Sequence, residues 1–365
     1  MREPDIVVIG SGPNGLSAAI KLATQGLRVL VLEENSRRPG GAVGSDEATL
    51  PGFVHDLGAG FFPLARLSPA FREFKLERFG LEWLNAEIES CHPALDGSSA
   101  SLIRLAGSDA MGFRAEGLGD EYFGSEADTR TFQRLAAEYA SNEAALVAAL
   151  LGPLPGLRAF ARLGLRGLLR LGLRFTQSTR RLSNRWFSSE AARRVLPGLA
   201  MHADLGPDAF AGAAMAYMLA FSATTVGYSV ARGGAQRLTD SLVTALELSG
   251  GQLQLGARAR RIVVRDRRAV AVQLQTGEEI SFRHAVLADT SPGQLLLELL
   301  PESTVPPYAI KAARSFRQGY GTFKIDYALG YPVPWRDANA RRSATVHIGE
   351  SVDDLARFVR ELEAG

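Results

Sequence analysis

The sequence predicts an α/β fold in which a parallel sheet with crossover helices is interleaved with a second, mostly helical domain. Two observations predict the sheet: a strand–turn–helix–strand unit at residues 5–32, and a return to short strands after residue 228. The helical patterns between about residues 68 and 227 predict the second domain. The 365 residues are enough for two such domains with sizeable cores.

The first unit opens with the β-branched run Asp5–Ile9, which is typical of a strand buried on both faces of a parallel sheet. A glycine-rich turn follows, and then apolar residues at helical spacing predict a helix over about residues 14–25. Gly26 ends this helix. Residues 27–32 form the next apolar strand, so the stretch is a βαβ unit.

The turn in this unit fits the pattern G-x-G-x-x-G. We expect Gly10 to allow the tight turn, Gly12 to let a pyrophosphate approach the backbone, and Gly15 to let helix and strand pack closely. The pyrophosphate would lie on the helix N-terminus, where free N–H groups favour negative charge. Glu33 ends the second strand, where a carboxylate accepts hydrogen bonds from ribose hydroxyls. The turn therefore predicts a dinucleotide site, to which its other members also contribute: Ser11, Pro13 and Asn14.

The rest of the chain divides by its periodicity. Helical patterns occur at about residues 68–79, 126–151, 157–175, 189–196, 207–221 and 235–248. Strands are predicted near residues 252–255, 259–264, 269–275 and 279–282, and residues 284–288 should return to the first sheet as a parallel strand. Further patterns occur at residues 293–300, 321–329 and 343–348, with a helix from about residue 352. The predicted domains are residues 1–67 with 228–291, and residues 68–227 with 292–365.

The stretch "ENSRRPGGAVGSDEATLPGFVHDLGAGFF" after Glu33 resembles the long flavin signature of the phytoene desaturase and amine oxidase superfamily. In that signature the ribose-binding acid is followed by a Gly-Gly pair and a "GF-x-x-D-x-G" segment, which Gly40-Gly41 and residues 52–58 match. Ala42 follows the phytoene dehydrogenase-related branch. The resemblance implies a Rossmann-like domain that binds FAD, whereas a pure NAD domain would continue with another crossover helix.

The resemblance also implies which residues hold FAD, beyond the glycine turn and Glu33: Glu34, Gly40, Gly41, Ala42, Val43, Asp56, Gly58, Gly233 and Ala259. Three of these residues have a second interpretation. Asp56 either bonds backbone amides near the isoalloxazine or caps a turn. Gly233 either contacts the flavin or belongs to a loop before a helix. Ala259 either touches adenine through its backbone or is part of a plain β-meander.

The function implied by the resemblance is an FAD-dependent oxidoreductase that moves a hydride from a lipophilic, isoprenoid-like substrate to flavin N5. Two alternatives stay open: an amine oxidase-like enzyme for a smaller substrate, and a non-catalytic flavin- or lipid-binding fragment. No residue is identified as catalytic by spacing alone. The family's second glycine-rich FAD segment has no counterpart after Pro292, so we expect a fragment or a shortened relative with weak flavin binding.

Composition excludes several other classes of function. The net charge of +2 does not indicate a nucleic-acid partner. The single cysteine, Cys91, excludes an intramolecular disulfide and favours a reducing, cytoplasmic compartment, where it is expected to be a passive thiol. The five histidines lack paired ligand spacing, so no metal site is predicted. No apolar run reaches the roughly 18 residues of a membrane span.

One charged stretch, residues 156–187, has two interpretations. Arginine recurs every four residues from Arg158 to Arg174, and leucines fill the spaces between them. As a helix, this stretch would bind the surface of a membrane if its arginine stems extended to headgroups while its leucines entered the acyl boundary. Alternatively, it is an ordinary surface helix that covers the core. The sequence does not indicate an oligomeric state.

Overall fold

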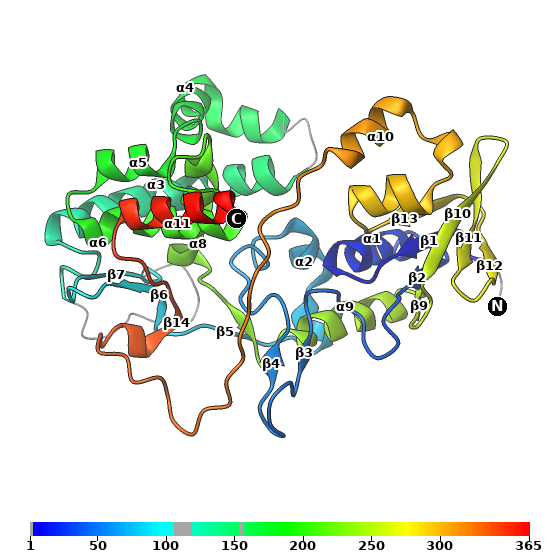
Figure 1. Ribbon diagram of the computed structural model, residues 1–365, viewed down its shortest axis with the longest axis horizontal. Helices are drawn as coiled ribbons and strands as arrows, with labels where there is room; N and C mark the ends of the chain where they lie inside the picture. The colour runs from blue at the N-terminus through cyan, green and yellow to red at the C-terminus, as the bar shows by residue number, and fades with distance from the viewer. Residues whose placement is uncertain (1–2, 106–118, 153–156) are drawn as a thin grey trace. The chain divides into compact units, whose positions relative to one another are not determined.

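The structure, a computed structural model, describes residues 3–105, 119–152 and 157–365, with the side chains at 157–160, 162 and 166 left out of the description (Figure 1). The chain forms two compact units, each built from separate stretches. Unit 1 comprises Met1–Phe61, Ala70–Trp83 and Val230–Gln318, and unit 2 comprises Phe62–Pro69, Leu84–Ser229 and Gly319–Gly365. Residues 70–83 and 292–318 thus lie with the sheet in unit 1, whereas the predicted boundaries put them in the second domain. Residues 62–67 and 228–229, predicted in the first domain, lie in unit 2.

Unit 1 is built on a four-stranded parallel sheet in the order β13-β1-β2-β9. Its strands are β1 (Ile6–Ile9), β2 (Val29–Leu32), β9 (Gln252–Gln254) and β13 (Ala285–Ala288). In register, Ile6 lies between Val29 and Ala285. The predicted return of residues 284–288 to the first sheet, and the α/β class, are therefore confirmed.

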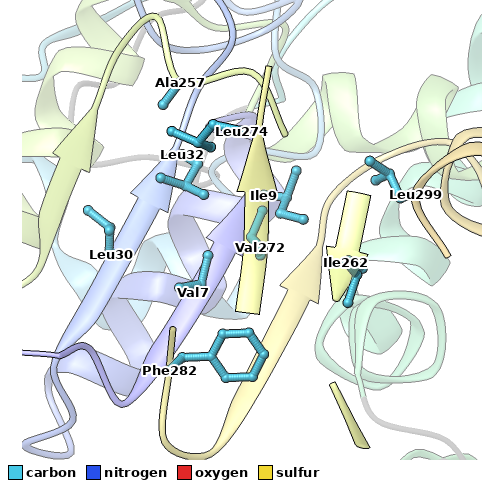
Figure 2. Close-up of a cluster of buried hydrophobic side chains, with 10 residues drawn as sticks. All are labelled: Val7, Ile9, Leu30, Leu32, Ala257, Ile262, Val272, Leu274, Phe282 and Leu299. Atoms are coloured by element: carbon cyan, nitrogen blue, oxygen red, sulfur yellow. The ribbon is translucent and has the colours of Figure 1, made fainter. Parts of the chain in front are cut away.

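A three-stranded antiparallel meander packs against one face of this sheet. It consists of β10 (Ala259–Arg265), β11 (Arg268–Leu274) and β12 (Glu279–Ser281). Because side chains alternate along a strand, Val7 and Ile9 of β1 point to the same face, and Figure 2 shows them with the side chains that fill this core: Leu30, Leu32, Ala257, Ile262, Val272, Leu274, Phe282 and Leu299. Ile6 and Val8 are buried too, so β1 is covered on both faces.

Unit 1 also holds helices α1 (Pro13–Ala23), α2 (Pro69–Phe74), α9 (Gln236–Leu248) and α10 (Pro307–Arg314), of which α1 packs on α9. The predicted helix at 68–79 is two pieces. Lys75 has φ +51°, a left-handed conformation that ends α2 and starts a 3-10 turn at Leu76–Phe79. A π-helical turn covers Gln294–Leu299, and short strands lie at Ser45–Asp46 (β3), His55–Asp56 (β4), Trp83–Leu84 (β5) and Val230–Ala231 (β8).

Unit 2 combines a helical layer with a three-stranded sheet in the order β14-β6-β7. Its helices are α3 (Glu126–Leu151), α4 (Leu157–Phe175), α5 (Thr179–Trp186), α6 (Glu190–Arg193), α7 (Val195–Ala200), α8 (Gly212–Thr225) and α11 (Val352–Ala364). Its strands are β6 (Ile88–Pro93), β7 (Ser99–Leu102) and β14 (Ser343–Val346). The bounds predicted for α3 and α4 are confirmed, although Gly164 (φ +62°) breaks α4.

Two expectations for unit 2 are wrong. The stretch expected to be mostly helical contains β6 and β7, whose buried polar residues Glu89, Ser90 and His92 hide the apolar pattern of a strand. The pattern at residues 321–329 predicted a regular element, but residues 315–339 hold neither a helix nor a strand. No described strand pairs with this segment, and an extended chain needs such a partner for its backbone N–H and C=O groups.

Candidate functional site

The glycine-rich turn joins β1 to α1 with the geometry expected of it. Gly10 has φ +97°, which only glycine adopts without strain. A Cβ on Gly15 would lie 2.3 Å from the Gly10 carbonyl oxygen, so the helix can approach the strand only because residue 15 is glycine. The predicted turn and packing roles of these two glycines are confirmed. Helix α1 begins at Pro13, and its N-cap residue, Gly12, has no side chain that could cap the first turn.

Glu33 lies directly beside this turn at the end of β2. It is buried, with 8% of its surface exposed. One carboxylate oxygen accepts hydrogen bonds from the backbone N–H of Ser11 at 3.0 Å and from the Ser11 hydroxyl, and the other accepts from the backbone N–H of Asn35 at 2.8 Å. A carboxylate offers about four acceptor positions. Glu33 can therefore still accept one hydroxyl, such as that of a ribose.

The Gly-Gly pair forms a second loop that lies against the first turn. The backbone N–H of Gly40 donates to the Ser11 hydroxyl at 3.2 Å. A Cβ on Gly41 would lie 3.7 Å from Gly12 Cα, so the two loops are within van der Waals distance. The loop closes on itself because the Val43 N–H donates to the Gly40 carbonyl at 2.9 Å. Residues from two separate segments of the sequence thus meet at the N-terminus of α1.

Asp56, Gly58 and Gly233 have structural roles next to this loop. One Asp56 oxygen accepts from the backbone N–H of Ala235, just before α9, at 2.7 Å, and from the Ser45 hydroxyl at 2.7 Å. Asp56 therefore bonds a backbone amide at the start of α9. A Cβ on Gly58 would lie 2.6 Å from the Ala42 carbonyl oxygen, and Gly233 has φ +82°. These three residues are accounted for by packing and turn geometry, and their contact with a flavin stays a prediction.

The segment that leads into β10 lies beside Glu33. The Ala257 N–H donates to the Glu33 carbonyl at 2.8 Å, and the Gly256 N–H donates to the Asn35 carbonyl at 3.1 Å. On the surface, Arg258 pairs with Glu34 at 3.5 Å. Ala259 is the next residue and the first of β10, so the predicted adenine contact lies close to Glu33 in space.

Asp289, which follows β13, belongs to this region but is not among the residues predicted from the sequence. Its Oδ2 accepts a hydrogen bond from the backbone N–H of Gly15 at 2.9 Å, inside the first turn of α1. A Cβ on Gly12 would lie 2.9 Å from the same oxygen. The sequence does carry a signal for it: residues 284–288 are predicted to return to the first sheet as a parallel strand, and the carboxyl ends of parallel strands meet at one edge of a sheet. The residue after such a strand therefore reaches the turn.

Unit 2 contains a hydrogen-bonded chain of side chains. The Ser90 hydroxyl bonds His92 Nε2 at 3.0 Å and His347 Nδ1 at 2.8 Å, and His347 Nε2 lies 2.7 Å from His202 Nε2. Burial lowers the pKa of His92 and His202, and lowers that of His347 to about 3. Among the described residues, no group of three or more His, Cys, Asp and Glu side chains is arranged to hold a metal ion.

Three curated relatives resemble the chain in sequence. Phytoene desaturase of Cercospora nicotianae is 27% identical over 93% of the chain and 53% of its own length, and hydroxyneurosporene desaturase of Cereibacter sphaeroides is 28% identical over 83% and 60%. One component of the limonene dehydrogenase of Castellaniella defragrans is 30% identical over 31% of the chain and 22% of its own length. The chain thus spans at most three-fifths of the length of these relatives.

Solved structures show the same fold. PF1083 from Pyrococcus furiosus aligns with 86% of the chain and 65% of its own, with a TM-score of 0.55 at 17% identity. A putrescine oxidase variant aligns with 86% and 63%, with a TM-score of 0.53 at 20% identity. Residues 14–359 match the sequence model of one family, described as flavin containing amine oxidoreductase. The chain therefore belongs to the family of flavin-containing amine oxidoreductases.

Proposed function

We propose that this protein is an FAD-dependent oxidoreductase that removes a hydride from a lipophilic substrate. The observation that carries the proposal is the meeting of three segments at one end of the parallel sheet: the Gly10–Gly15 turn, Glu33, and the Gly40–Gly41 loop. These segments supply the chemistry that the AMP half of FAD needs, which is backbone N–H groups at a helix N-terminus for phosphate and a carboxylate for ribose.

Each segment has a defined task in binding. The first turn of α1 supplies N–H groups and a positive dipole end for the pyrophosphate. The acceptor position left on Glu33 would take a ribose hydroxyl, and the backbone of Ala259, the first residue of β10, would contact the adenine. Glu34, Ala42 and Val43 are included in the proposed site because the family resemblance assigns them to it. Bound FAD supplies the redox chemistry, since its isoalloxazine can accept a hydride from an activated carbon.

The substrate class is inferred from the relatives. Two are named as desaturases of phytoene and hydroxyneurosporene and one as a dehydrogenase of limonene, which supports a lipophilic, isoprenoid-like substrate. The family description supports an amine as the second candidate. The single cysteine favours a reducing, cytoplasmic setting for either reaction. None of the helices in the described part of the chain combines the length and apolar character that a membrane crossing requires.

Cofactor choice is tested by titrating the flavin-free protein with FAD and with NADH. We expect FAD to bind and NADH not to bind. Glu33→Ala should weaken FAD binding roughly ten- to a hundredfold, because a hydrogen bond to a charged acceptor contributes about 1.5–3 kcal/mol. Glu247→Gln, which removes an exposed carboxylate of α9, is the control for charge. Tight NADH binding without FAD uptake would overturn the proposal.

Substrate class is tested by anaerobic reduction of the FAD-loaded protein, followed as loss of visible flavin absorbance. Isoprenoid hydrocarbons and primary amines are offered separately. Bleaching by the hydrocarbons alone supports the proposal, and bleaching by amines alone supports the second candidate. Retention of oxidised flavin with both sets would identify a flavin-binding protein without turnover.

A further inference from the structure

We propose that the outer face of α4 docks this protein on an anionic lipid bilayer. The face is a row of leucines, Leu165, Leu169 and Leu173, whose side chains are 74%, 59% and 71% exposed. They are spaced four residues apart, so they form one ridge along the helix. Figure 1 shows α4 among the helices of unit 2. This inference does not depend on flavin binding.

The ridge is turned away from the body of unit 2. Helix α4 packs on α3 and α8 through other residues. Arg174 bonds Glu138 of α3 at 2.9 Å, and the Phe175 ring lies 5.6 Å from the Tyr217 ring of α8. At roughly 100° per residue, the directions of Arg174 and Phe175 lie more than about 100° from the middle of the leucine row. The leucines are therefore available to a partner outside the unit.

Helix α4 is broken at Gly164, just before the leucine ridge. Gly164 has φ +62° and ψ 170°, and a Cβ built on it would meet nothing within 4 Å. The helical segment after it, residues 165–175, has its own direction and its own apolar face. Without the break, Leu163 and Leu165 would belong to one continuous spiral. The three leucines of the ridge therefore all lie on the helical segment that follows Gly164.

The charge around the ridge identifies the partner as an anionic surface. Between Glu143 and Glu190 the sequence holds eight arginines and neither Asp nor Glu. Of the five arginines spaced through α4, the structure describes the side chains of Arg170 and Arg174. Arg170 lies 3.7 Å from Glu138 but is 69% exposed, and Arg181 and Arg185 of the next helix are also exposed. Arginines beside an apolar ridge fit a bilayer interface, where stems extend to headgroups and leucines enter the acyl boundary.

A bilayer accounts for both the arginines and the exposed leucines of this surface, whereas each of the other candidate partners accounts for only one of them. Nucleic acid would use the arginines but has no apolar layer to receive three exposed leucines. A second copy of the chain would cover the leucines but would bring the same arginines together, which costs Coulomb energy. We therefore commit to anionic lipid as the partner.

The test is co-sedimentation of the full chain with vesicles at low salt. Vesicles of phosphatidylcholine with phosphatidylglycerol are compared with vesicles of phosphatidylcholine alone. We expect binding to the anionic vesicles only, weakened by added salt. Replacing the three leucines of the ridge by Gln should lower partitioning at least about tenfold. Leu95→Gln is the matched control, since Leu95 is 85% exposed on a turn of the same unit and should not matter.

Charge and insertion are measured separately. Arg170→Gln should lower partitioning about fivefold, since an arginine near an anionic surface contributes about 1 kcal/mol. Arg360→Gln, which alters an exposed arginine of α11, is its control. A Leu169→Trp variant should show a blue shift in fluorescence when anionic vesicles are added.

Three results would overturn the proposal. The first is equal recovery of the unaltered protein with and without anionic vesicles. The second is unchanged binding of the leucine variant, which would mean that charge alone holds the protein. The third is concentration-dependent self-association that the leucine variant loses in the absence of lipid, which would assign the ridge to a second copy. The FAD titration above is run on the same preparations, so failure of one proposal is distinguishable from failure of the other.

Discussion

Replacing Asp289 by Asn should strengthen the binding of FAD. In the structure its carboxylate accepts a hydrogen bond from the Gly15 N–H, 2.9 Å away, in the first turn of α1. In the proposed function, the same helix end receives the negatively charged pyrophosphate of the cofactor. Asp289 therefore stabilises the empty turn and repels the ligand. An asparagine oxygen can accept the same hydrogen bond without the negative charge.

The size of the effect follows from Coulomb's law. Two unit charges about 5 Å apart repel by about 1 kcal/mol in water and about 3 kcal/mol at the effective dielectric constant near a protein surface. Asp289 is half-buried, so solvent screens part of this repulsion. We expect the smaller figure, which corresponds to about a fivefold lower Kd for FAD in the Asp289→Asn protein.

The assay is isothermal titration of flavin-free protein with FAD at low and at high salt. The gain should shrink as salt rises, because salt screens the repulsion that the substitution removes. Asp266→Asn removes the same charge from an exposed turn of unit 1 and should leave the Kd unchanged. An equal or higher Kd for Asp289→Asn, at unchanged thermal stability, would refute the reasoning.

Three further predictions concern unit 2. Glu89→Gln removes the carboxylate 2.5 Å from the buried Arg104 guanidinium and should lower the free energy of unfolding by about 3–5 kcal/mol in urea titrations; a loss under about 1 kcal/mol would contradict this. His347 has a pKa of about 3 when folded and about 6.5 when unfolded, so its contribution to the free energy of unfolding is fully present above pH 6.5 and is lost as pH falls. The free energy of unfolding should be about 2 kcal/mol lower at pH 5 than at neutral pH. His347→Asn should abolish this loss, whereas His284→Asn, at an exposed histidine, should not. Burial raises the pKa of Cys91 to about 12, so the thiol should react with a disulfide reagent at pH 8 only when the protein unfolds, and rapid labelling of the folded protein would count against this.

Local patterns predicted the first part of the site because its chemistry is local. The residues from Asp5 to Glu33 form one βαβ unit, in which apolar spacing sets the strands and helix and glycine sets the turn. The same reasoning predicted that residues 284–288 return to this sheet as a parallel strand, and the structure pairs them with β1. It failed for β6, where Glu89 accepts from the Tyr228 N–H and His92 stacks on His347, and no local period reports partners so far away in the sequence.

What the sequence by itself determined is the α/β class, the glycine turn, the acid at Glu33 and the two segments that resemble a flavin signature. The tertiary structure alone decided which groups meet. It put Asp289 on the Gly15 N–H, 274 residues away, and Asp56 on the Ala235 N–H. It also turned Leu165, Leu169 and Leu173 outward, a choice between two faces of α4 that the Arg–Leu repeat left open. The physical reason is that hydrogen-bonding and packing partners are set by how the chain folds back on itself, whereas turns and periodic faces depend only on near neighbours.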